Sequence, residues 1–303
     1  VLVSSCSVNP STIYGVITIP ATSELIFADA LITNFRAKGI IVQGALRAGS
    51  ETCLLRQKIT ITLHGSRGAQ TLPGDPSTKG IYTTGTIDVH GAMYYPTWTR
   101  LARTASPGDT TIYIQDVPNW QPGQEILITT SELKDSRDFN RNEVRTIAAI
   151  SLTTLDATVA AITLTAPLTY KHFGGREYQS EVALLTRNII IQGDETNSEP
   201  TDTTSAVCTA GGSTFPCNNK YLTGFGGHVQ VAGANAQGRF TGVQLYRMGQ
   251  TNVLGRYPLH FHLMGDAANT RAWARACSVT RSYFRAYAIH GTNRALLDSN
   301  TAY

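Results

Sequence analysis

The most reactive side chains of the sequence gather in the segment 254–266, which reads LGRYPLHFHLMGD. Two of the seven histidines, His260 and His262, stand two residues apart in it. Side chains at positions i and i+2 of an extended strand leave the same face, so both imidazoles are expected to point the same way. Arg256 precedes the pair and Asp266 follows it, in a chain of which only 15% is charged. The segment therefore brings two imidazoles, a guanidinium and a carboxylate to one place.

Two more histidines occupy comparable places in neighbouring segments. His228 opens HVQVA and His290 lies in AIHGT, at spacings of 32 and 30 residues from His260. If each strand belongs to a successive coil of a solenoid, equivalent side chains lie about 4.8 Å apart. The spacing predicts a column of His228, His260 and His290, with His262 beside it.

Three interpretations of this column stay open. The imidazoles could form a structural ladder that is bonded to the backbone. They could hold a divalent transition metal, because neutral imidazole is a favoured ligand of zinc, copper and nickel. The predicted metal ligands are His228, His260 and His290. The imidazoles could also carry acid–base catalysis on a bound glycan. The predicted catalytic residues are His260, His262, Asp266, His290 and Arg256.

In the catalytic interpretation, the histidines and Asp266 share proton transfer while a guanidinium holds an anionic group. Arg256 is the predicted guanidinium, and Arg281 and Arg285 could bind a uronate in the same way. Ordinary glycosidases instead place two carboxyl groups about 5–9.5 Å apart. Asp266 and Asp298 are the carboxylates nearest the histidines in the sequence.

The composition favours an all-β protein that positions these side chains on strands. The charged fraction lies below the roughly 25% of ordinary soluble domains, and 27 of the 303 residues are glycine. The phrases ITLHG and IDVHG recur 26 residues apart. Repeats of about 20 to 30 residues that carry strands and no helix are typical of a β-solenoid. We interpret His64 and His90, which precede the glycines of these phrases, as repeated structural positions.

Three segments are expected along the chain. We expect short solenoid strands in residues 1–96 and the coils that carry the histidines in residues 186–303. Between them, residues 97–185 contain longer alternating strands with Pro-Gly turns, which are typical of antiparallel hairpins. The predicted fold is therefore a parallel β-helix with an antiparallel β insertion or cap.

The five cysteines favour an oxidising, extracytoplasmic setting. No C-x-x-C spacing occurs, which disfavours a zinc knuckle. Cys208 and Cys217 bracket a polar loop and are expected to form a local disulfide, and Cys6 and Cys53 are candidates for a second. Cys277 lies in an apolar alternating strand and is expected to be a buried free thiol.

The charge distribution excludes some classes of partner. The net charge of +4 is scattered, without a run of like charges, so nucleic-acid binding is not expected. The same charge is compatible with an anionic polysaccharide. No apolar run of 18 residues is present, so no membrane span is predicted in this piece.

Several phrases resemble a known family. ITLHG, GTIDVHG, WTRLART and NWQPGQEILITTS resemble the extracellular domain named for its eight glycines. LGRYPLHFHLMGD and RACSVTRSYFRAYAIHGTNRALLDSNTAY resemble the β-helix that follows this domain in fibrocystin, fibrocystin-L, the cell-migration-inducing hyaluronidase and the transmembrane cell-surface hyaluronidase. The resemblance implies a right-handed parallel β-helix and an extracellular or cell-surface location.

The resemblance also implies two alternative functions. The hyaluronidase members imply a glycan-processing hydrolase that depolymerises an anionic polysaccharide such as hyaluronan, with calcium as an alternative to a histidine-bound transition metal. The fibrocystin members imply a non-catalytic module of a large cell-surface or ciliary coat protein, which binds glycans or neighbouring subunits. With either function, we expect the module to continue into, or assemble with, further β-helical segments.

Overall fold

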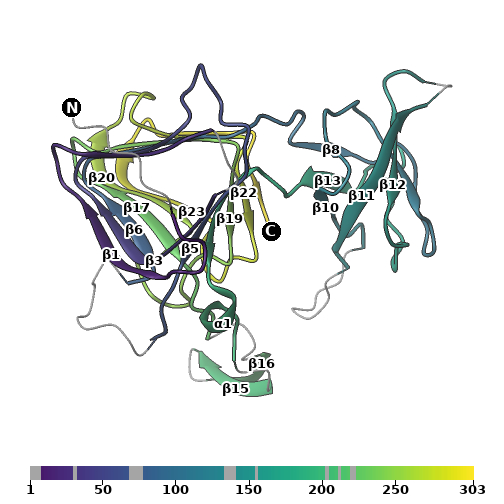
Figure 1. Cartoon of the computed structure of the whole chain (residues 1–303). Coiled ribbons are helices and arrows are strands. Elements are labelled where there is room, and N and C mark those ends of the chain that lie inside the picture. Colours follow the sequence, from purple (N-terminus) through teal and green to yellow (C-terminus); the bar gives the residue numbers. More distant parts are fainter. Residues whose placement is uncertain are drawn as a thin grey trace. The chain divides into compact units, whose positions relative to one another are not determined.

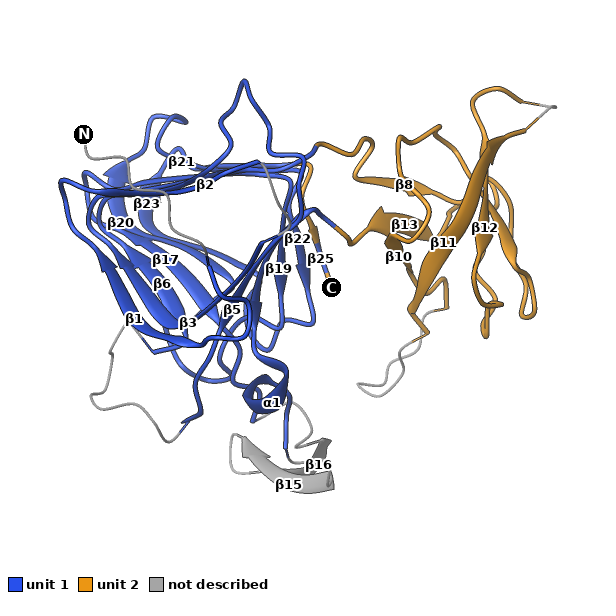
Figure 2. Ribbon diagram, in the orientation of Figure 1, with its two compact units in different colours: residues 1–92, 187–298, 302 blue, residues 93–186, 299–301, 303 orange. Residues whose placement is uncertain are grey.

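The computed structural model forms two compact units (Figure 2). It describes the chain apart from residues 1–7, 30–32, 68–77, 133–140, 154–155, 202–204, 211–212 and 219–222, and apart from the side chains of 205–210 and 213–218. The first unit contains residues 1–92, 187–298 and 302. The second contains residues 93–186, 299–301 and 303.

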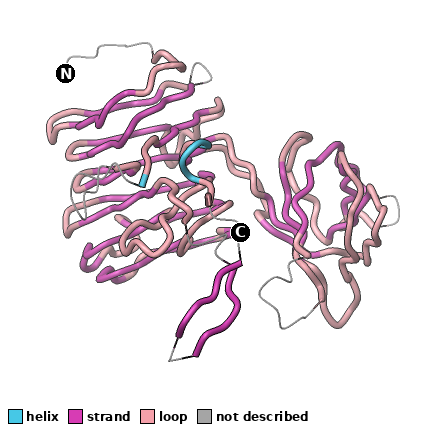
Figure 3. Tube along the Cα trace, turned by 90° about the horizontal axis from the view of Figure 1, so that it is seen from below, coloured by secondary structure: helices cyan, strands magenta, loops and turns pink. Residues whose placement is uncertain are grey.

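The first unit is a parallel β-helix whose coils stack on one another (Figures 1 and 3). A curled sheet supplies two of its faces, because the long strand β3 (Thr33–Val42) pairs with β5 through its first half and with β6 through its second half. A separate six-stranded sheet supplies the other face.

The strands of each face run parallel and come from successive coils. The face that carries the histidines consists of the second half of β3 with β1 (Tyr14–Ile19), β6 (Gly80–Thr83), β17 (His228–Ala232), β20 (Leu259–Asp266) and β23 (Tyr287–Asn293). The separate sheet consists of β2 (Glu24–Phe27), β4 (Ala45–Ala48), β7 (Thr86–His90), β18 (Gln237–Thr241), β21 (Ala272–Arg275) and β24 (Leu296–Asp298). The remaining face consists of the first half of β3 with β5 (Ile59–Leu63), β14 (Ile189–Gly193), β19 (Val243–Tyr246), β22 (Ser278–Thr280) and β25 (Thr301–Ala302).

Coils from the two ends of the sequence meet in one stack. β6 pairs with both β3 and β17, and β14 pairs with both β5 and β19. Strands from both predicted solenoid segments, 1–96 and 186–303, are joined edge to edge, so they share one hydrophobic core.

The core is a set of aliphatic columns that run through the coils. In β14, the side chains of Ile189 and Ile191 are fully buried, whereas the intervening Ile190 is only half-buried. Ile191 lies opposite Ile61 on one neighbouring strand and opposite Leu245 on the other. The period-2 alternation thus places one residue type at the same inward position of successive coils.

The second unit is antiparallel and contains the segment 97–185 that was expected as an insertion. Its sheet has the order β8 (Trp98–Arg100), β13 (Glu181–Leu184), β10 (Glu125–Ile128), β11 (Glu143–Leu152), β12 (Ala160–Leu164) and β9 (Thr111–Ile114). It has its own core, which includes Trp120 and Ile162. The unit therefore interrupts the β-helix between β7 and β14.

The histidines of the repeated phrases each contact a carboxylate. His64 Nδ1 lies 3.3 Å from the carboxylate of Asp194, and His90 Nε2 lies 2.6 Å from that of Asp88. His90 is fully buried, and its Nδ1 lies 3.0 Å from the hydroxyl of Thr241. The contacts of His64 with Asp194 and of His90 with Thr241 tie neighbouring coils together, whereas His90 and Asp88 belong to one strand.

The segment between β14 and β17 holds the helix and hairpin of the first unit. Asp194 caps α1 (Glu195–Ser198) by accepting a hydrogen bond from the backbone of Asn197. β15 (Ser205–Ala210) and β16 (Ser213–Asn218) pair in antiparallel fashion. Over the residues that the structure covers, no helix is long and apolar enough to cross a membrane.

The structure tests part of what was predicted for the cysteines. Cys277 is a buried free thiol, as predicted, and burial raises its pKa to about 11. Cys53 is a free, exposed thiol. Cys6 and the side chains of Cys208 and Cys217 lie outside the described residues. The Cys208–Cys217 disulfide therefore stays a prediction, whereas the free thiol of Cys53 does not form the candidate disulfide with Cys6.

Candidate functional site

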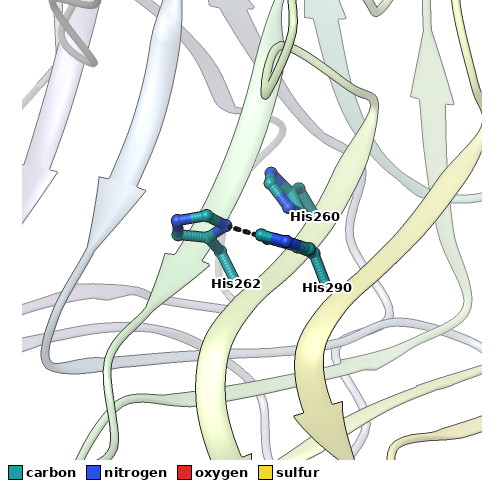
Figure 4. Close-up of side chains that lie close together, drawn as sticks. All are labelled: His260, His262 and His290. Carbon is teal, nitrogen blue, oxygen red and sulfur yellow. Dashed lines mark hydrogen bonds between the residues drawn. The ribbon is translucent and has the colours of Figure 1, made fainter.

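Three of the predicted histidines come together on the outer surface of one face (Figure 4). β20 pairs with β23 so that His262 lies opposite His290. Phe261, between His260 and His262, points inward and is part of the hydrophobic core. Because side chains alternate along a strand, burial of Phe261 turns both neighbouring imidazoles outward.

The three imidazoles are close enough to act on one ligand. Each offers a ring nitrogen that lies within 4.8 Å of the other two. Nδ1 of His262 and Nδ1 of His290 are 3.1 Å apart. The ring centroids of His260 and His262 are 4.8 Å apart, and those of His260 and His290 are 6.3 Å apart. We call these three residues the histidine cluster.

His260 is the buried member of the cluster, with 3% of its surface exposed. Its Nδ1 lies 3.2 Å from the carbonyl oxygen of Gly255, which can only accept, so Nδ1 carries the proton. Its Nε2 is buried and has no hydrogen-bond partner within the described structure. Burial lowers the pKa of His260 to about 4, and the neighbouring imidazoles of His262 and His290 act in the same direction. The ring is therefore neutral at pH 7, with its Nε2 lone pair available.

The cluster lines a pocket of about 800 Å³. Arg256, Arg285 and Tyr257 line the same pocket. None of the described residues that line it is Asp or Glu. The histidine pocket is therefore cationic and suits an anionic ligand.

Arg256 is held in the pocket by His228. Arg256 is 4% exposed and its Nη1 lies 2.8 Å from Nε2 of His228. Since a guanidinium can only donate, His228 accepts through this nitrogen. His228 is fully buried and packs on Gly80, where an added Cβ would lie 2.2 Å from the imidazole. Arg256 thus lines the pocket and has a buried partner.

The predicted common register of His228, His260 and His290 was wrong, because His290 lies opposite His262 and His228 is paired elsewhere. In the parallel pairing, His260 lies opposite Gln230 on β17 and opposite Ala288 on β23. His228 lies opposite Gly80 instead, two residues out of step. The segments that connect successive coils differ in length, so a count of residues between histidines does not give the register. His262, which was expected only beside the column, completes the cluster.

Asp266 lies outside the histidine pocket. The pairing of β20 with β23 is irregular between His262 and Gly265, and Leu263 and Gly265 have φ of 50° and 62°. Beyond this irregularity, the exposed carboxylate of Asp266 accepts hydrogen bonds from Arg294 and from the backbone of Ala268. The hydrogen bond from Arg294 lowers the pKa of Asp266. The structure therefore gives the imidazoles no carboxylate partner at this position.

Of the other residues considered for the site, Arg285 and Tyr257 line the pocket and Arg281 does not. Arg285 lines the pocket, and its guanidinium lies 5.7 Å from the centre of the Tyr257 ring. Arg281 contacts Glu199 and Tyr246 instead. Tyr257 was not predicted as a site residue. The sequence feature that could have identified it is its position directly after Arg256 and two residues before the first residue of β20.

The pocket fits a nitrogen-preferring metal better than calcium. Calcium takes six to eight oxygen ligands, mostly carboxylate and carbonyl oxygens. The described lining offers imidazole nitrogens and no carboxylate. Calcium, as implied by the resemblance, does not fit this pocket, and we derive no chemistry through it.

Comparisons with known proteins give the family. Residues 1–102 match the G8 domain and residues 224–303 match the CEMIP beta-helix. A G8 domain-containing protein of Dictyostelium discoideum is 44% identical over 306 residues, which is 100% of this chain and 19% of that protein. Protein rliB of the same organism is 43% identical, over 100% of this chain and 24% of its own length. Human fibrocystin-L is 34% identical over 92% of this chain and 7% of its own length.

This chain thus spans about a fifth of the length of the Dictyostelium relatives. Among solved structures, the tailspike gp61 of Pseudomonas phage phi297 aligns with a TM-score of 0.28 and 11% identity, over 84% of this chain and 39% of that one. A likeness at that level carries no argument. The two domain matches and the relatives agree with the motifs of the sequence. The chain therefore belongs to the family of proteins that join a G8 domain to a CEMIP β-helix.

Proposed function

We propose that this chain is an extracellular or cell-surface β-helix module that binds and depolymerises an acidic polysaccharide such as hyaluronan. The observation that carries the proposal is the histidine pocket, which three clustered histidines line together with two arginines. The G8 domain and the relation to fibrocystin-L support the location. The resemblance to the hyaluronidase members of the family supports the substrate.

The pocket offers the groups that a uronate polymer needs for binding. A guanidinium group can hold a carboxylate through two parallel hydrogen bonds. Arg285 is exposed, whereas Arg256 is buried and hydrogen-bonded to His228.

The histidine cluster offers the groups that bond cleavage needs. Cleavage of a glycosidic bond by water requires a proton for the leaving oxygen and an acceptor for a proton of water. Because no carboxylate lines the described pocket, these roles fall to the imidazoles or to a water that they position. His262 and His290 are accessible, whereas His260 lies behind them with 3% exposure.

The proposal is tested by incubating the chain with hyaluronan of defined size and following polymer length on a gel. We expect the length to fall with time. We expect the double variant His262→Ala/His290→Ala to lower the rate by about 100-fold or more, the scale of acid–base catalysis. The exposed Arg176→Ala, in the antiparallel unit, serves as the matched surface control and should leave the rate unchanged. Unchanged polymer length beside an active hyaluronidase would refute depolymerisation.

One observation favours a second candidate, a non-catalytic glycan-binding module. The described pocket lacks the pair of carboxylates that ordinary glycosidases use. The same module would still bind a polyanion through Arg256 and Arg285. Retention of hyaluronan on the immobilised chain, weakened by Arg285→Ala and without shortening of the polymer, would favour this candidate.

A further inference from the structure

The geometry points to a binding site for one divalent late first-row transition ion, of the zinc type, held by His260, His262 and His290. The site does not depend on the proposed function, because metal binding can be measured without polysaccharide. It differs from the set expected from the sequence, since His262 takes the place of His228. His228 is engaged with Arg256 and lies outside the cluster.

The distances between the imidazole nitrogens suit a shared ion. Zinc–nitrogen bonds are about 2.0–2.1 Å, so two nitrogens on one tetrahedral ion lie roughly 3.3–3.4 Å apart. Nδ1 of His262 and Nδ1 of His290 are already 3.1 Å apart. One ring nitrogen from each of the three residues, His260 included, lies within 4.8 Å of one from each of the other two. A small rotation of the side chains therefore brings all three onto one ion.

His260 supplies an independent indication of a ligand. Its Nε2 is buried and without a hydrogen-bond partner in the described structure, although buried polar atoms are nearly always paired. Its other nitrogen is engaged with the carbonyl of Gly255. This is the arrangement of a metal-binding histidine, in which the outer nitrogen donates to an oxygen and fixes the ring. A bound ion would satisfy the orphaned lone pair.

The backbone holds the cluster ready for binding. His260 and His262 come from one strand, and His290 comes from the strand paired with it. Phe261, on the inner side, anchors the same strand in the core. Three protein ligands with a position open to the pocket are typical of catalytic zinc sites, whereas structural sites are closed by four.

The charges of the pocket indicate the kind of fourth ligand. Three neutral imidazoles leave the full double charge of the ion uncompensated, and Arg256 and Arg285 add positive charge to the same pocket. An anion at the fourth position, such as hydroxide or a carboxylate, would offset this charge. All-nitrogen donors also favour zinc, copper, nickel or cobalt over calcium and magnesium.

The site is tested on the chain after removal of metals with a chelator. We expect isothermal titration with Zn²⁺ to give one ion per chain, and titration with Co²⁺ to give the visible absorption of a tetrahedral nitrogen site. Millimolar Ca²⁺ should not displace either ion. We expect His290→Ala and His262→Ala to weaken binding by at least about 10-fold, since even partners one shell further out contribute 10- to 100-fold.

Gln230→Ala is the matched control, because Gln230 lines the same pocket and lies opposite His260 without belonging to the cluster. It should leave the affinity unchanged. Circular dichroism establishes that each variant is folded before its titration is interpreted. Absence of stoichiometric Zn²⁺ on the wild-type chain would overturn the inference, as would equal affinity in the double variant His262→Ala/His290→Ala. Neither result depends on whether hyaluronan is cleaved.

Discussion

At the scale of single residues, the sequence predicted the face of the strand on which a side chain lies, because that follows from strand alternation. It did not predict which residue lies opposite on the next strand, because that follows from the register of the pairing. The two-residue spacing of His260 and His262 sufficed to place both on one face. The partner of each side chain on the next strand depends on the length of the connecting segment. His228 therefore lies opposite Gly80. Asp266 lies away from the histidines because the pairing of β20 with β23 is irregular between His262 and Gly265, which no sequence motif indicates.

Gly80 is the residue on which the place of His228 depends. An alanine Cβ at this position would lie 2.2 Å from the imidazole and would displace it from Arg256. We expect Gly80→Ala to lower the free energy of unfolding by about 1–3 kcal/mol, as overpacking of a closed site does. Urea denaturation measures the loss.

Gly15→Ala is the matched control for this substitution. Nothing lies within 4 Å of a Cβ added at Gly15, which is also a strand residue. We expect this variant to keep the wild-type stability or to gain up to about 1 kcal/mol, because alanine restricts the unfolded chain. Equal losses in both variants would show that the loss of glycine, and not the contact with His228, matters.

At the scale of elements, strand type was predictable and strand partners were not. Short alternating strands between glycines identified a parallel solenoid, because each coil needs one inward and one outward set of side chains. The pairing of β14 with β5, across more than a hundred residues of sequence, could not be read from the pattern. It arises because the antiparallel unit is inserted within the stack of coils.

The inward column at β14 gives a direct test of this arrangement. Ile191 is fully buried between Ile61 and Leu245, so Ile191→Ala should lower the free energy of unfolding by about 2–5 kcal/mol. Ile190, its neighbour in the same strand, is only half-buried. Ile190→Ala should cost about 1 kcal/mol or less. If chemical denaturation gave the reverse order, the assigned inward face of β14 would be wrong.

The antiparallel unit contains a buried carboxylate that should make its stability depend on pH. Glu143 is 3% exposed. Burial alone would raise its pKa, but hydrogen bonds from the backbone of Thr169 and from His172 outweigh burial and hold the pKa below the ordinary value of 4.5. The unfolded chain therefore binds the proton first as the pH falls. The contribution of Glu143 is complete above its unfolded pKa and is lost as the pH falls through the folded one.

We expect the free energy of unfolding to decrease as the pH is lowered below 4.5, the ordinary pKa of a glutamate. Glu143→Gln should cost about 3–5 kcal/mol at pH 7, because it leaves the buried partners of the carboxylate unmatched. It should also flatten the dependence on pH in the acid range. Glu177→Gln, an exposed residue of the same unit, is the control. A pH profile of Glu143→Gln that parallels that of the wild type would contradict the assignment.

At the scale of the whole molecule, composition and repeats were enough to predict an all-β parallel helix with an antiparallel component. They could not show that strands of the G8 segment lie next to strands of the CEMIP β-helix in one stack. Residues 1–92 and 187–298 fold as one unit because strands of the first segment pair with strands of the second on every face, β6 with β17, β5 with β14 and β7 with β18. The histidine pocket therefore belongs to a scaffold to which both segments contribute.

The ends of the inserted unit meet within the β-helix, which suggests that the insertion can be removed. The backbone N–H of Ala92 donates to the side chain of Asn188 at 2.8 Å, and Asn188 in turn donates to the carbonyl of Leu55. A short glycine–serine linker could therefore replace residues 93–186, because long and short surface connections differ little in closure entropy. Each unit has its own hydrophobic core.

We expect this deletion variant to keep the far-ultraviolet signature of a β-helix and to bind Zn²⁺ with the wild-type stoichiometry. The reason is that every ligand of the inferred site lies on β20 or β23, within the first unit. Introducing His290→Ala into the deletion variant supplies the control for specific binding. A variant that folds but no longer binds the ion would mean that the antiparallel unit contributes to the site. A variant that fails to fold would mean that β7 and β14 need it to reach their places in the stack.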